Sequence, residues 1–282
     1  MNRPTPPRTR GVNLAIPIGL VVIALIAILA WLRQTETSPP PPTTVVAPTP
    51  IASAEPPQPA PALEPKPEIS NPVDKIEIAP AQLGPLPPRD QSDEAAKSAA
   101  ATLAEQAALN DNVFDESLVR RFVATVDNLP RETLPMRVRL FRGTPGQFVI
   151  EGKEESRSIA PENWVRYAPF IRFLQSLDSK KLVAVYLGFY PMLQEEYRAL
   201  GYPKKQFNDR VVEAIDDMLA APELPDPIML VQPKVMYKFA DPELESMSAG
   251  RKIMVRIGID NARIVKAKLR EIRAFIAVDK PN

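Results

Sequence analysis

Two hydrophobic patterns divide the chain. Residues 12–32 form an apolar run without a charged side chain, whereas apolar residues after about residue 90 recur every three or four positions. At about 1.5 Å per residue, a helix over the run is about 30 Å long, which matches the hydrocarbon core of a bilayer. The run therefore predicts one transmembrane helix. A cleavable secretory signal is disfavoured, because its apolar region is normally only about 7 to 15 residues long.

Charges beside the run predict its orientation. Arg3, Arg8 and Arg10 precede it, whereas Arg33 stands alone behind it. Positive charge is retained on the cytoplasmic side of a membrane span. We therefore expect residues 1–11 to form a cytoplasmic tail, with the remainder on the periplasmic side of a bacterial inner membrane.

A proline-rich segment separates the run from the periodic part of the chain. Residues 34–88 hold 17 of the 34 prolines. This composition disfavours a packed core, so residues 33–89 are predicted to be a disordered linker. A spacer role is the simplest interpretation, and a docking site for a proline-recognising domain is the alternative. One short strand is expected at Ile76 and Ile78, which alternate with polar neighbours.

Residues 90–278 are predicted to fold as a mainly helical domain. Helical spacing, capping residues and terminal proline or glycine define seven helices: 93–109, 115 or 117 to 128, 161–177, 179–200, 208–220, one from 242, and 260–277. Alternating apolar residues around a turn at 143–146 predict one β-hairpin over 136–151. The expected fold class is therefore mainly α, with one small hairpin, after a transmembrane helix and a disordered linker.

The helix over residues 179–200 is predicted to be central. Its apolar positions follow one another at spacings of 4, 3, 4, 4 and 3 residues: Leu182, Tyr186, Phe189, Leu193, Tyr197 and Leu200. Core packing is the favoured interpretation of this aromatic stripe, and the lining of a ligand groove is the alternative.

Composition restricts the chemistry open to the domain. The chain contains no cysteine and no histidine. Their absence excludes disulfides, thiolate and imidazole metal sites, and catalysis by serine–histidine or cysteine–histidine pairs. A net charge of +1 gives no general attraction to nucleic acid, so none is expected as a partner. No catalytic residue, metal or cofactor is assigned.

A basic stripe is the first candidate partner-binding surface. It comprises Arg263, Lys266, Arg270 and Arg273, which lie at spacings of 3, 4 and 3 on the last predicted helix. One interpretation is a solvated face, or one paired inside the domain with acidic residues. The other is a binding surface for an acidic partner: a protein, an anionic lipid headgroup or an envelope polymer.

An acidic face is predicted on the helix over 208–220, and it consists of Asp209, Glu213, Asp216 and Asp217. With Glu195 and Glu196, these residues are the only candidates for carboxylate-based hydrolysis or hard-cation binding, and such spacing is common on helices. Asn208 or Asp209 is the expected helix cap. Lys234 and Tyr237 lie where a loop meets a strand and are further candidates for partner binding.

Four phrases in the domain resemble a known family. They are LVRRFVATVDNLP (118–130), FNDRVVEAIDD (207–217), LVQPKVMYKFADP (230–242) and SAGRK (248–252). In this order they are similar to the bacterial family catalogued as domain of unknown function 3014. The resemblance implies a Gram-negative envelope protein, and it carries no catalytic or binding residue over to this chain.

We therefore expect a membrane-anchored envelope protein whose helical domain binds another envelope component without catalysis. The linker confines the domain near the membrane and raises its effective concentration for partners there. The alternative is a carboxylate-based hydrolase or a cation-binding enzyme of the envelope. The sequence defines no oligomeric state.

Overall fold

The structure is a computed structural model that describes residues 69–278. The predicted cytoplasmic tail (1–11), the predicted span (12–32) and residues 33–68 of the predicted linker lie outside the described residues. Within residues 69–278, no helix combines the length and the apolar character needed to cross a membrane.

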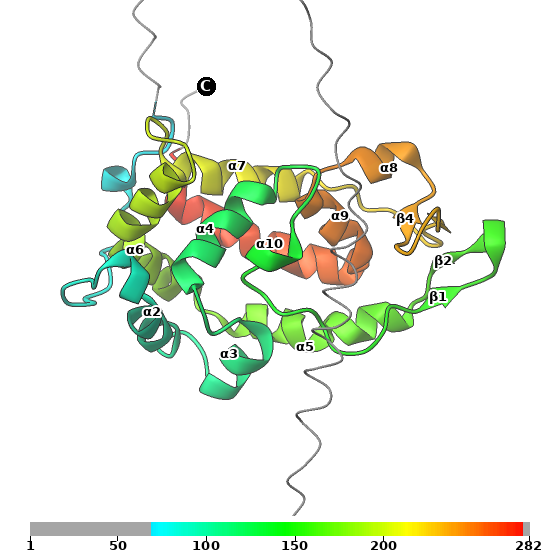
Figure 1. Cartoon of the computed structure of the whole chain (residues 1–282), viewed down its shortest axis with the longest axis horizontal. Helices are drawn as coiled ribbons and strands as arrows, with labels where there is room; N and C mark the ends of the chain where they lie inside the picture. Colours follow the sequence, from blue (N-terminus) through cyan, green and yellow to red (C-terminus); the bar gives the residue numbers. More distant parts are fainter. Residues whose placement is uncertain (1–68, 279–282) are drawn as a thin grey trace, which may run out of the picture. The chain divides into compact units, whose positions relative to one another are not determined.

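Helices dominate the described part of the chain (Figure 1). The α-helices are α2 (Asp93–Ala100), α3 (Gln106–Asn112), α4 (Leu118–Asn128), α5 (Glu162–Ser176), α6 (Ser179–Ala199), α7 (Phe207–Leu219), α8 (Pro242–Ser246), α9 (Ala249–Arg256) and α10 (Ile259–Ile276). Short 3-10 helices lie at Val73–Lys75, Arg89–Gln91, Met136–Val138 and Glu154–Ser156. Two antiparallel strand pairs complete the fold: β1 (Ile150–Glu151) with β2 (Ser158–Ile159), and β3 (Leu230–Val231) with β4 (Lys238–Phe239). The mainly helical class is confirmed.

The main core lies where α4, α6, α7 and α10 pack together (Figure 1). Its most deeply buried side chains are each 1% exposed or less: Val123, Val183, Phe207 and Ile276. Burying a side chain of this size stabilises the fold by about 1.5–3 kcal/mol. Further along, α10 packs beside α5 and α9 around a second cluster, and a third cluster lies under the strand pairs.

Helix α6 begins and ends close to its predicted limits. The Asp178 carboxylate accepts a hydrogen bond from the backbone N–H of Lys181, which satisfies one of the free amides at the helix start. The helix supplies six buried side chains to the main core: Val183, Leu187, Phe189, Met192, Leu193 and Tyr197. Its buried face includes Val183 and Leu187, whereas Leu200 at the end of the predicted stripe is 37% exposed.

Two predicted helix boundaries were wrong. The helix expected over 93–109 is divided into α2 and α3, and the Thr102 hydroxyl donates to the carbonyl of Ala99 at the break. The break lets α2 pack on α4 and α3 on α5, which one straight helix does not do. Helix α7 begins at Phe207, so Asn208 is not its cap and lies inside it, fully buried.

The predicted hairpin over residues 136–151 was also placed wrongly. Residues 136–138 form a 3-10 helix, and the next residues pair with the end of α3, where Phe114 N–H donates to Leu140 O and Val113 bridges Phe141. Strand β1 pairs instead with β2, which follows it. A bridge between Ser158 and Met229 then joins the two strand pairs. Alternation predicted extended chain here but could not identify the partner.

Residues 69–91, here called the strap, pack on the domain instead of belonging to the linker. Five of their apolar side chains lie against the main core: Val73, Ile76, Ile78, Leu83 and Leu86. The predicted strand at Ile76 and Ile78 does not form. The strap follows α6, and the backbone N–H of Ala81 donates to Ala184 O at 2.8 Å. The domain therefore begins before the predicted boundary at residue 90.

Gly188 of α6 is the position where the strap approaches most closely. A β-carbon there would lie 2.7 Å from Leu83 Cδ1 and 3.0 Å from the carbonyl oxygen of Ala81. We expect Gly188→Val to push the strap outward and to lower the free energy of unfolding by about 1–3 kcal/mol. Thermal unfolding and limited trypsin cleavage at Lys75 measure this change. Gly143→Val is the matched control, since nothing lies within 4 Å of the new β-carbon, and equal effects of the two variants would contradict the packing described.

Candidate functional site

The basic stripe is largely occupied by contacts within the domain. Lys266 is only 4% exposed, and its Nζ donates to Ala221 O at 2.7 Å and to Glu223 Oε1 at 3.2 Å. Arg263 Nε lies 2.9 Å from Glu223 Oε2. These two hydrogen bonds, Arg263 first, lower the pKa of Glu223. Arg273 binds Asp216, and Arg270 alone is exposed without an ion pair among the described residues.

The acidic face is occupied in the same way. Asp209 accepts hydrogen bonds from the backbone and side-chain N–H groups of Asn71, at 2.7 and 3.1 Å. Glu213 Oε1 lies 2.7 Å from Arg210 Nη1, and Asp217 Oδ1 lies 2.8 Å from Arg251 Nε. The pairing envisaged between the basic stripe and the acidic face is present once, between Asp216 and Arg273. The other carboxylates bind different partners.

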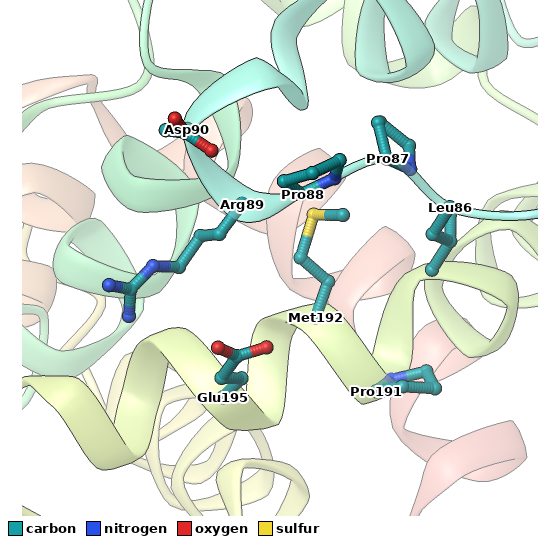
Figure 2. A pocket seen from close by; sticks show the side chains of 8 residues that line it. All are labelled: Leu86, Pro87, Pro88, Arg89, Asp90, Pro191, Met192 and Glu195. Atoms are coloured by element: carbon teal, nitrogen blue, oxygen red, sulfur yellow. The ribbon is translucent and has the colours of Figure 1, made fainter.

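Glu195 and Glu196 point to different environments. Glu196 is 6% exposed and forms ion pairs with Arg89 at 3.2 Å and Arg120 at 3.9 Å. Glu195 is exposed at the rim of a pocket of about 510 Å³ between α6 and the strap. Figure 2 shows that the pocket floor is apolar, with Met192 reaching from α6 toward Pro88. The pocket has no converging set of polar groups that would position a substrate. Among residues 69–278, no group of three or more carboxylates is placed to hold a metal ion.

A polar cleft of about 300 Å³ lies between the C-terminal end of α4 and α7. At its base Asp127, 6% exposed, is held between Arg131 Nη2 at 3.0 Å and Arg210 Nε at 3.3 Å. The Arg131 guanidinium also donates to the hydroxyl of Tyr202, whose ring stacks on Tyr197 with 4.6 Å between centroids. Burial is the main reason that the pKa of Tyr197 rises to about 12, so its hydroxyl stays protonated.

Sequence reasoning identified only the edge of this cleft. Asp127 and Arg131 follow one another on α4 and its end, whereas Tyr202 and Arg210 lie more than 70 residues later, so no local pattern connects them. One signal was available: the phrases at 118–130 and 207–217, which carry the family resemblance, meet here. Tyr197 belonged to the predicted aromatic stripe.

The loop between β3 and β4 carries the most exposed apolar side chains near a predicted site residue. Val235 is 84% exposed and Met236 is 74% exposed. Lys234 beside them is exposed, whereas Tyr237 is half-buried and packs on Phe148 with 6.0 Å between ring centroids. Of the predicted pair, only Lys234 is therefore presented to solvent, and Tyr237 supports the loop from below. Sequence reasoning passed over Val235 and Met236, although an apolar pair after Gln-Pro-Lys was visible.

Comparison with known proteins identifies one family. A family model described as "Protein of unknown function (DUF3014)" matches residues 118–273. Searches of curated proteins and of solved structures found no match. The matched region contains the polar cleft's charged residues and the β3–β4 loop, and it spans more than half of the 282 residues. The chain therefore belongs to the DUF3014 family.

Proposed function

We propose that this chain is a membrane-anchored interaction protein of the bacterial cell envelope. The apolar run at 12–32, with its arginines in front, supports one inner-membrane span with the N-terminus in the cytoplasm and the domain in the periplasm. The domain binds another envelope protein and performs no catalysis. Its location beyond a proline-rich linker raises its effective concentration for partners close to the membrane.

The exposed apolar tip of the β3–β4 loop carries this proposal. Val235 and Met236 are adjacent and are more than 70% exposed, although a solvated loop gains nothing from presenting apolar surface. The loop backbone is held in place, because Gln232 Nε2 donates to Val235 O at 3.1 Å and Tyr237 packs below. A tip held in this way presents its two side chains at little entropic cost, which suits anchor residues of an interface.

Local charge favours a protein partner over an anionic lipid or polymer. Residues 223–246, which include the loop, hold five carboxylates and two lysines, a net charge of −3. Lys238 is itself 3.7 Å from Glu245. An anionic surface would be repelled by this end of the domain. A protein with an apolar pocket and a basic rim fits both the tip and the charge around it.

A carboxylate-based hydrolase receives no comparable support. Each residue of the acidic face already binds an arginine, a serine or backbone amides, and the exposed Glu195 borders a largely apolar pocket. A general acid in such an enzyme needs a raised pKa beside a second carboxylate in a shared cleft. The acidic face offers neither arrangement.

Photo-crosslinking in cells tests the proposed interface. A photoreactive residue replaces Met236 in the full-length chain, and Met136 is the matched control because it is the same residue type with the same exposure, 75% against 74%. We expect a discrete protein adduct from position 236 only. Val235→Asp should reduce the adduct on the order of tenfold, because a hot-spot contact is worth at least about 1.4 kcal/mol.

The melting temperature of Val235→Asp should stay unchanged, since the side chain contacts solvent. Equal adducts from 136 and 236, lipid adducts alone, or an adduct that survives Val235→Asp would each contradict the proposal.

A further inference from the structure

Two hydrogen-bond donors in the polar cleft have no acceptor. Tyr197 is 2% exposed and lines the cleft, yet its hydroxyl makes no hydrogen bond with any described group. Arg210 Nε is buried and has no hydrogen-bond partner, because its contact with Asp127 at 3.3 Å is an ion pair without hydrogen-bond alignment. Buried polar groups are nearly always paired in native proteins. Two such donors in one cleft indicate an acceptor that the chain does not supply.

The charges around the cleft favour an anionic acceptor. Its lining holds four cations and three carboxylates, a net charge of +1. One carboxylate, that of Asp209, is compensated by neutral N–H groups of Asn71 and needs no cation. The remaining two carboxylates, Asp127 and Glu213, share Arg131 and Arg210. The lining therefore has more positive charge than its own carboxylates require.

The size of this surplus distinguishes between anionic groups. A carboxylate carries one negative charge and would neutralise the lining. A phosphate monoester carries about −1.5 to −2 at neutral pH and would lie beside three carboxylates with charge left over. The volume of about 300 Å³ is at the lower end of the range for small-molecule sites. The stacked rings of Tyr197 and Tyr202 supply the apolar wall that such sites usually have.

We infer that this cleft binds a small molecule through its carboxylate group, which accepts hydrogen bonds from the Tyr197 hydroxyl and the Arg131 guanidinium. Arg131 is suited to this role because Nε and Nη2 already hold Asp127 and Tyr202, whereas Nη1 makes no hydrogen bond within the described residues. Lys205 lies over the ring of Tyr202 at 5.6 Å and closes the cleft with a second exposed cation. Arg210 fixes the base.

Titration of the full-length chain in a nonionic detergent tests this inference. The probe is N-acetylglycine, and N-acetylglycinamide is the neutral control of the same shape. The arginine Nε–H signals, observed by nuclear magnetic resonance, report on Arg210 directly. We expect a saturable shift of the Arg210 signal with the acid and none with the amide. Inorganic phosphate should bind more weakly than the acid.

Tyr197→Phe removes only the hydroxyl and keeps the ring stack. We expect it to weaken binding of N-acetylglycine by about 5–10 fold, the value of one hydrogen bond, with no change in melting temperature. Tyr237→Phe, outside the cleft, should bind the acid normally. Equal shifts with acid and amide, no saturable shift, tighter phosphate binding, or a destabilised Tyr197→Phe variant would each overturn the inference.

Discussion

Replacing Lys266 by glutamate is expected to lower the free energy of unfolding by about 3–5 kcal/mol, because it leaves a buried charge without a partner. The Lys266 ammonium donates to Ala221 O and Glu223 Oε1. A glutamate there would direct a carboxylate at two acceptors in a site that is 4% exposed. For a domain of this size the melting temperature should fall by about 6–20 °C. Thermal and urea unfolding measure the effect.

Arg270→Glu is the matched control for Lys266→Glu. Arg270 belongs to the same helix face, is exposed, and makes no ion pair among the described residues. Its reversal should change the free energy of unfolding by less than about 0.5 kcal/mol. If Lys266→Glu left stability unchanged while it abolished partner binding, the basic stripe would be an interface and the burial described here would be wrong.

Asn208→Ala is expected to cost about 3–5 kcal/mol, since it removes a fully buried amide that joins three parts of the domain. Its Nδ2 donates to Asn71 O at 2.8 Å and to Ile276 O at 3.0 Å, and its Oδ1 accepts from the Tyr186 hydroxyl at 2.9 Å. Each group left unpaired carries its own desolvation penalty.

Hydrogen exchange should locate this loss. We expect faster exchange in residues 71–78 of the strap and in the last turn of α10, with α5 unaffected. Asn110→Ala is the control, because Asn110 is exposed and accepts only from Gln106. Uniformly faster exchange throughout the domain would show that Asn208 supports the whole core instead of these two segments.

Local signals were sufficient to predict several helices. Asp178 caps α6, Asn128 ends α4 shortly before Pro130, and Asp241 caps α8 at Pro242, all as expected. Each of these features depends on residues within one helical turn, where capping and proline chemistry act. The direct outcome was a correct fold class with mostly correct helix ends.

Features that depend on distant partners could not be predicted in the same way. The helical spacing of Lys266 suggested a solvated charge, but its acceptors, Ala221 and Glu223, lie more than 40 residues earlier. The strap contains prolines, which masked its apolar residues, and an extended chain that packs irregularly leaves no period to detect. Asn208 looked like a cap because its side chain suits caps, whereas the fold uses the amide to join distant carbonyls.

The two ends of the described chain meet at one place, and this has a mechanical consequence. Asn71 binds Asp209 and Asn208 through its backbone, and its side chain accepts from the N–H of Val278 at 3.1 Å. Tension on the chain before residue 69 is therefore applied first to these few hydrogen bonds and then to the strap, one contact after another. Detachment of the 23 strap residues would add up to about 75 Å of reach while the helices beneath keep their connections.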